Sequence, residues 1–149
     1  MALETVLLAL SESDRDRLDP LLETVVDVAA PADAAVVLTH VYTQSEFDEV
    51  AANLNLEGGG EPTAVQAARR EAVVRDVSER LDDAGLSYRV ESQIGDHGEA
   101  IVDIATREGV DLVVVSGRSR SPTGKAVFGS TAQRVLLSSP APVTFVRGD

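Results

Sequence analysis

Small and basic residues gather in one stretch near the end of the chain, residues 111–147. Arg118, Arg120 and Lys125 fall within eight residues there and precede a Gly-Ser-Thr triplet at 129–131, where a helix is expected to begin. Guanidinium and ammonium groups donate charge-assisted hydrogen bonds to phosphate. The first N–H groups of a helix have no internal partner, and the helix dipole favours an anion there. These residue types predict a phosphate site, although the same cations could instead neutralise local carboxylates.

The elements that must position this site alternate between strand and helix, which favours an α/β fold with a mainly parallel sheet. Continuous apolar runs predict buried strands and apolar residues at helical spacing predict helices. The expected strands are residues 5–10, 35–41, 88–94, 112–115 and 143–146. The first expected helix follows the polar stretch 11–14 and ends at about residue 29. The other expected helices span residues 63–84, 99–107 and 130–138. Pro20 fits the first turn of the first helix, and Gly85 fits the end of the longest one.

One segment, residues 45–62, does not follow this alternation. Phe47, Val50, Leu54 and Leu56 are spaced as in a short amphipathic helix, and three glycines follow them. A connection of this length is commonly functional. We expect a mobile flap beside the site, with a variable surface loop as the equal alternative.

The charge of the chain is strongly acidic. It has 13 basic and 25 acidic residues among 149, a formal net charge of −12, and Lys125 is the one lysine. Such a field opposes binding to nucleic acid and to anionic membranes. A lysine-poor acidic surface favours a halophilic protein, because concentrated salt screens its self-repulsion. The length predicts one domain over residues 1–149. The lack of cysteine, and an apolar N-terminus that predicts a strand rather than a signal peptide, fit a cytoplasmic protein.

Several landmarks together resemble the universal stress protein family, its haloarchaeal-type members in particular, over essentially the whole chain. They are TVLLAL at the start, LTHV at 38–41, IGDHGEAI at 94–101 and FGSTAQRVLLSSPAPVTFVR at 128–147. The resemblance implies a doubly wound five-stranded parallel sheet of order 3-2-1-4-5, Rossmann-like and of the adenine nucleotide alpha hydrolase type. It also implies homodimers, here paired through the last strand, Val143–Arg147, and ATP or another adenine nucleotide as ligand, with Mg²⁺ only alongside the nucleotide.

In such a sheet, ligands bind beyond the carboxyl ends of the strands where the strand order reverses, here between the first and fourth strands. Both the loop after residue 10 and the loop after residue 115 lie at that point. The predicted binding residues are Ala9, Leu10, Ser11, Val41, Ser116, Gly117, Arg118, Ser119, Arg120, Lys125, Gly129, Ser130 and Thr131.

Two departures from the family pattern weaken this site. The ATP-binding branch carries Gly-x2-Gly-x9-Gly-Ser/Thr, and counting back from Gly129 puts Ser116 and Ser119 at the first two glycines. Serine restricts the close backbone approach that glycine allows. The aspartate that ends the first strand in that branch is matched here by Ser11, so a carboxylate becomes a single hydroxyl. Asp14 lies nearby but out of register.

Other constellations are weaker. Gly117 and Gly124 are too far apart for a phosphate-binding P-loop, and Ala126 replaces its Ser/Thr. His40 is expected to pack along a strand and His97 to lie at a helix start, and two distant histidines without cysteine do not predict a transition-metal site.

Three functions remain open at this point. The first is an adenine-nucleotide-binding stress protein. The second is a family member with a degenerate site that acts through a protein partner and holds at most a simple anion. The third, ranked last, is an enzyme of slow ATP hydrolysis or phosphotransfer, because no catalytic base stands out.

Overall fold

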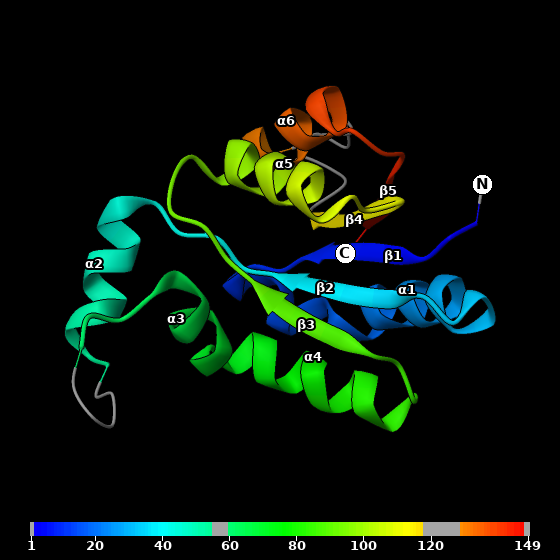
Figure 1. Ribbon diagram of the computed structural model, residues 1–149, viewed down its shortest axis with the longest axis horizontal. Helices are drawn as coiled ribbons and strands as arrows, with labels where there is room; N and C mark the ends of the chain where they lie inside the picture. Colours follow the sequence, from blue (N-terminus) through cyan, green and yellow to red (C-terminus); the bar gives the residue numbers. More distant parts are fainter. Residues whose placement is uncertain (1, 55–59, 118–128, 148–149) are drawn as a thin grey trace.

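The centre of the molecule is a five-stranded parallel sheet of order β3-β2-β1-β4-β5 (Figure 1). The computed structural model describes residues 2–54, 60–117 and 129–147. The strands are β1 (Thr5–Ala9), β2 (Ala35–Thr39), β3 (Tyr88–Glu91), β4 (Leu112–Gly117) and β5 (Val143–Arg147). The predicted fold class and strand order are confirmed. The order reverses between β1 and β4, so the loops that follow these two strands diverge and leave a crevice.

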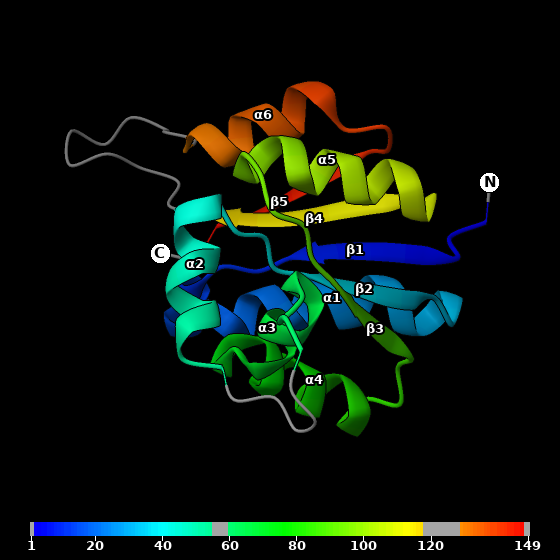
Figure 2. The same cartoon turned by 60° about the vertical axis from the view of Figure 1, so that its left-hand side comes forward.

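Helices cover both faces of the sheet, α5 and α6 one face and α1, α3 and α4 the other (Figures 1 and 2). The helical segments are η1 (Glu12–Arg17, a 3-10 helix), α1 (Leu18–Ala32), α2 (Gln44–Ala52), α3 (Ala64–Arg70), α4 (Ala72–Asp83), α5 (His97–Glu108) and α6 (Ser130–Ser138). In the described part of the chain, no helix is both long and apolar enough to span a bilayer.

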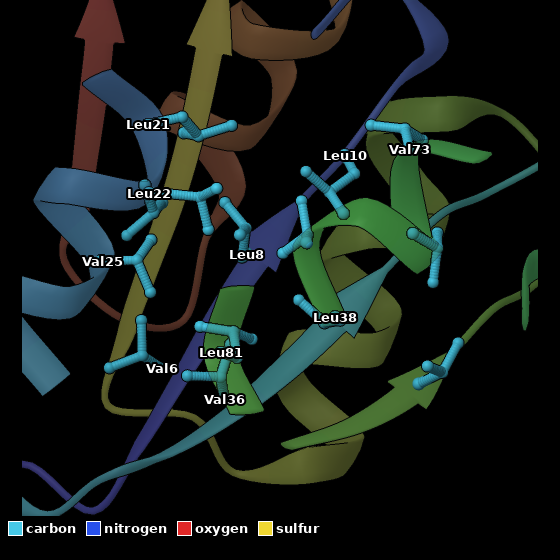
Figure 3. Close-up of a cluster of buried hydrophobic side chains, with 14 of the residues drawn as sticks. Val6, Leu8, Leu10, Leu21, Leu22, Val25, Val36, Leu38, Val73 and Leu81 are labelled. Atoms are coloured by element: carbon cyan, nitrogen blue, oxygen red, sulfur yellow. The ribbon is translucent and has the colours of Figure 1, made fainter. Parts of the chain in front are cut away.

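The continuous apolar runs of the strands follow from this two-sided cover, because successive strand side chains point to opposite faces. Val6 and Leu8 belong to the core on the α1 and α4 face, whereas Leu7 belongs to the core on the α5 face. Figure 3 shows the first of these cores, in which strand residues meet side chains of α1 and α4. The fully buried side chains labelled there include Val6, Leu8, Leu21, Val25, Val36, Leu38, Val73 and Leu81. Burial of each stabilises the fold by about 1.5–3 kcal/mol.

The predicted single helix over 63–84 is wrong, because the chain forms two helices separated at Glu71. Glu71 has extended backbone angles (φ −65°, ψ 135°) and serves as the N-cap of α4. The apolar pattern shifts phase there, since Ala72 is exposed while Val73 and Val74 are buried. The Glu71 side chain accepts a hydrogen bond from the Tyr42 hydroxyl (2.9 Å). The chain thus leaves the helical conformation at the residue that makes this tertiary contact. At the other end, Gly85 has φ +75° and follows the last turn of α4, as predicted.

The segment after β2 forms the short helix that its apolar spacing predicts. Thr43 and Glu46 form a capping box at the start of α2, in which each side chain accepts the other's backbone N–H. Phe47 and Val50 are partly buried against the core, and no residue of α2 is fully buried. Residues 55–59 of the predicted flap lie outside the described residues.

The remaining boundaries differ from the predictions by a few residues. The predicted strand 35–41 ends at Thr39, and the strand 88–94 ends at Glu91, after which an isolated bridge joins Tyr42 to Ile94. The helix expected over 99–107 begins two residues earlier because Asp96 caps it, accepting the Glu99 N–H (3.1 Å). The first helix is preceded by η1. The helix 130–138 is as predicted.

Candidate functional site

A cavity of about 1080 Å³ opens at the carboxyl ends of β1, β2 and β4, where the strand order reverses. The predicted binding residues within the described part of the chain all line it: Ala9, Leu10, Ser11, Val41, Ser116, Gly117, Gly129, Ser130 and Thr131. Arg118, Ser119, Arg120 and Lys125 lie outside the described residues. The structure therefore brings together residues separated by more than a hundred positions, and their role in binding stays a prediction.

The N-terminus of α6 forms one wall of the cavity. Gly129 is its N-cap, with φ −62° and no side-chain cap, and Ser130 and Thr131 follow in the first turn. The helix is held against α5 at Gly98, where no side chain separates the two helices and the Arg134 Cβ lies 2.6 Å from the position that a Gly98 Cβ would occupy. An exposed ion pair between Arg134 and Glu99 (2.7 Å) joins the same helices. Packing against α5 thus fixes where the first N–H groups of α6 point.

Asp14 connects the loop after β1 to the end of β4. Its side chain is buried, and one carboxylate oxygen accepts from the Ser11 N–H (2.8 Å) and the Ser11 hydroxyl (3.2 Å). The other oxygen accepts from the Arg17 Nε (3.0 Å) and the Ser116 hydroxyl. Four donors use the acceptor capacity of a carboxylate. Asp14 therefore shapes the corner of the cavity, and both of its oxygens are already engaged.

A second polar group lies at the β2 end of the cavity and comprises His40, Tyr42 and Glu71. The Tyr42 hydroxyl donates to Glu71 Oε1 (2.9 Å), and His40 Nε2 lies 3.9 Å from the same oxygen. His40 Nδ1 lies 3.2 Å from the Leu10 carbonyl oxygen, which can only accept. The proton of the neutral ring is therefore on Nδ1, and Nε2 is an acceptor.

Burial sets the protonation states of His40 and Tyr42. Desolvation lowers the pKa of His40 and outweighs the opposing effects of Glu71, the Leu10 carbonyl, Glu12 and Glu46. Burial, together with the hydrogen bond to Glu71, raises the pKa of the Tyr42 hydroxyl. At neutral pH both the His40 ring and the Tyr42 hydroxyl are consequently uncharged.

The rim of the cavity carries a contact between α2 and α5. His97, the first residue of α5, places Nε2 2.6 Å from Oε1 of Glu46 on α2. Partial burial acts to raise the pKa of Glu46, but the Thr43 N–H and His97 outweigh it, so the pKa is lowered. His97 thus lies at the start of a helix, as predicted, and contributes to the rim of the cavity.

The described lining is predominantly acidic. It includes five acidic residues, one arginine (Arg17) and two histidines (His40 and His97). The acidic residues are Glu12, Asp14, Glu46, Glu49 and Glu71. Sequence reasoning missed most of this set, because Glu71 and Glu49 come from helices whose spacing gives no functional signal. Within residues 2–54, 60–117 and 129–147, no three His, Asp or Glu side chains are grouped so that they could hold a metal ion.

Solved structures with this fold include nucleotide complexes. The chain superposes on a universal stress protein in complex with cAMP with a TM-score of 0.69 and 19% identity, covering 100% of both chains. It superposes on the Archaeoglobus fulgidus universal stress protein in complex with dAMP with a TM-score of 0.67 and 18% identity, covering 99% of this chain and 100% of the other. An Arabidopsis thaliana family protein with AMP bound gives 0.65 and 13%, over 98% of this chain and 92% of the other. At these identities the likeness shows the fold.

The chain is also similar in sequence to known proteins and to a family model. It is 35% identical over 79 residues to a universal stress protein of Mycolicibacterium smegmatis, an alignment that covers 52% of this chain and 61% of that protein. It is 26% identical over 134 residues to a universal stress protein of Methanothermobacter thermautotrophicus, covering 87% of this chain and 88% of the relative. The family model described as "Universal stress protein family" matches residues 3–147. The chain therefore belongs to the universal stress protein family.

Proposed function

We propose that this universal stress protein binds ATP or a related adenine nucleotide in the cavity between β1 and β4. The observation that carries the proposal is the cavity itself, which runs from the N-terminus of α6 to the polar group at the end of β2. It lies at the topological switch point, where doubly wound folds bind nucleotides. The adenine nucleotides in the neighbouring structures support the same ligand class.

The phosphates belong at the α6 end. Backbone N–H groups at a helix N-terminus favour an anion, and Ser130 and Thr131 add hydroxyl donors. We expect Arg118, Arg120 and Lys125 to supply further charge-assisted bonds. Mg²⁺ would enter with the nucleotide, held by its phosphates.

A second candidate is a protein that acts through a partner and holds no nucleotide. The observation in its favour is the acidic lining described above, which repels a polyanion, together with the engagement of both Asp14 oxygens. The two candidates differ in whether nucleotide is present on the purified protein.

Native mass spectrometry with nucleotide extraction, on protein purified in high salt, tests the proposal. We expect stoichiometric adenine nucleotide on the wild type and its loss in Gly129→Val. No atom of the described residues lies within 4 Å of a Cβ built at Gly129, so a folded variant is expected and a loss of ligand reports on the site. Ser138→Val, at the far end of the same helix, is the control and should retain nucleotide. A wild type without nucleotide would favour the partner-driven candidate.

We further propose a cytoplasmic homodimer paired through β5. This strand has β4 as its neighbour on one side and lies at the edge of the sheet. An unpaired apolar edge is a liability that pairing across a two-fold axis removes. Analytical ultracentrifugation should find a dimer, and Thr144→Lys should shift it towards monomer. A wild-type monomer, or an unaffected variant dimer, would contradict this interface.

The net charge of −12 also motivates a dependence on salt. We expect the midpoint of urea unfolding to fall steeply when KCl is lowered from molar to about 0.1 M, because screening is lost as the Debye length grows. Full stability in dilute buffer would argue against a halophilic origin.

A further inference from the structure

The end of β2 is separated from the end of β4, on the other side of the cavity, by the width of two strand spacings. β1 lies between β2 and β4, and neighbouring strands are about 4.8 Å apart. His40 and Tyr42 at the end of β2 are therefore about 10 Å from Ser116 and Gly117 at the end of β4. A nucleoside can bridge this span, with its phosphate at α6 and its base beside Glu71.

The electrostatics of the cavity favour that orientation. Glu71, Glu12 and Glu46 all act on His40, so three carboxylates face the β2 end. Negative charge at this end opposes phosphate there, whereas the N-terminus of α6 favours it. These charges favour a nucleotide that has its uncharged base towards Glu71 and its phosphate towards α6.

The β2 end also has a defined pattern of acceptors. The Tyr42 hydroxyl is spent on Glu71 Oε1, and among the described residues no donor contacts the second oxygen, Oε2. His40 Nε2 is an acceptor because its Nδ1–H faces the Leu10 carbonyl oxygen. The Glu71 side chain remains 22% exposed and lines the cavity, so a ligand can reach it. Two acceptors side by side match the two N–H donors of an exocyclic amino group and repel the lone pairs of a carbonyl oxygen.

We propose that Glu71, with His40 beside it, selects the base of the bound nucleotide by accepting hydrogen bonds from an exocyclic amino group. This inference rests on the proposed nucleotide site and adds its base specificity. The break between α3 and α4 would serve this role, because it places Glu71, with its extended backbone, beside Tyr42 at the cavity.

Calorimetric titration with AMP and IMP tests this, because AMP carries a 6-amino group beside an acceptor N1, whereas IMP carries a 6-oxo group beside an N1–H donor. We expect wild-type protein to bind AMP at least tenfold more tightly, since the amino group of AMP can donate to both Glu71 Oε2 and His40 Nε2, whereas IMP can donate only through N1–H and brings its 6-oxo oxygen against an acceptor. Glu71→Gln, which offers both a donor and an acceptor, should bring the two affinities within about threefold by weakening AMP and strengthening IMP. Glu79→Gln on the exposed face of α4 is the matched control and should keep the wild-type ratio.

Tyr42→Phe tests whether the Glu71 carboxylate selects the base without the hydrogen bond from the Tyr42 hydroxyl. This variant removes the donor to Oε1 but leaves Glu71 charged, so the preference for AMP should persist. Equal wild-type affinity for AMP and IMP, or an unchanged ratio in folded Glu71→Gln, would overturn the specificity role while leaving the nucleotide site intact. Absence of binding by both nucleotides would overturn the proposed function and the specificity role with it.

Discussion

Gly98 controls how closely α6 approaches α5, so replacing it with alanine is a direct test of the packing that positions the cavity. It is the second residue of α5 and is buried. The added Cβ would lie 2.6 Å from the Arg134 Cβ and 2.7 Å from its Cγ. The Arg134 Cγ can turn away about χ1, but the Cβ is fixed to the backbone and moves only with α6. The substitution must therefore push α6 away from α5.

Two opposing effects set the magnitude. An extra methyl group in a packed interface costs about 1–3 kcal/mol, and replacing glycine by alanine within a helix recovers up to about 1 kcal/mol. We expect Gly98→Ala to lower the free energy of unfolding by about 1–2 kcal/mol, or the melting temperature by about 2–4 °C per kcal/mol for a domain of this size. Because α6 carries Gly129 and Ser130, affinity for nucleotide should fall as well.

Urea unfolding followed by circular dichroism measures this change, and a double-mutant cycle with Arg134→Gly isolates its cause. Arg134→Gly removes both clashing carbons, so in that background Gly98→Ala should be neutral or stabilising. Two results would refute the reasoning: a neutral Gly98→Ala in the wild-type background, or an equal loss of stability in both backgrounds.

The other predictions concern the core and the titrating groups. Leu81→Ala should reduce the free energy of unfolding by about 2–5 kcal/mol, because Leu81 is fully buried; Leu137→Ala, 79% exposed on α6, should change it by less than about 0.5 kcal/mol. The pKa of His40 is lowered in the folded state from its ordinary value of 6.5, so the unfolded chain binds more protons on acidification. Urea unfolding at several pH values should therefore show stability falling below pH 6.5, by at most about 1.4 kcal/mol per pH unit, and a stable His40→Gln variant should show a smaller decline. Glu46→Gln should lower the free energy of unfolding by less than about 1 kcal/mol, because the contact of Glu46 with His97 is exposed to solvent. The difference between variant and wild type should disappear in 1 M salt; a larger or salt-independent loss of stability would contradict this.

Much of the fold was predictable because its signals are local. Apolar runs that alternate with helical periods identified the five strands and their parallel arrangement, and the Gly-Ser-Thr triplet at 129–131 located the start of α6. The order of strands, which the family resemblance implied and the structure confirms, placed the crevice between β1 and β4. Each described residue predicted for the site lines the cavity, since the ends of parallel strands converge at one edge of a sheet.

The acidic half of the cavity was not predictable from the sequence. The helical periodicity favoured an unbroken helix through Glu71. The comparison with the family pattern matched its aspartate to Ser11, so Asp14 was not predicted as a site residue. Asp14 is buried because donors from Ser11, Arg17 and Ser116 meet around it, and Ser116 is 102 residues away in the chain.

The sequence by itself predicted all five strands and most of the helices, in their order along the chain, because these depend on neighbours within a few residues. The tertiary structure alone decided the chemistry at the β2 end of the cavity. Tyr42 and Glu71 are 29 positions apart, and their hydrogen bond requires that α3 end so that the carboxylate turns inward. A buried hydroxyl needs a partner at a particular place in space, and no local pattern records where the folded chain will bring one.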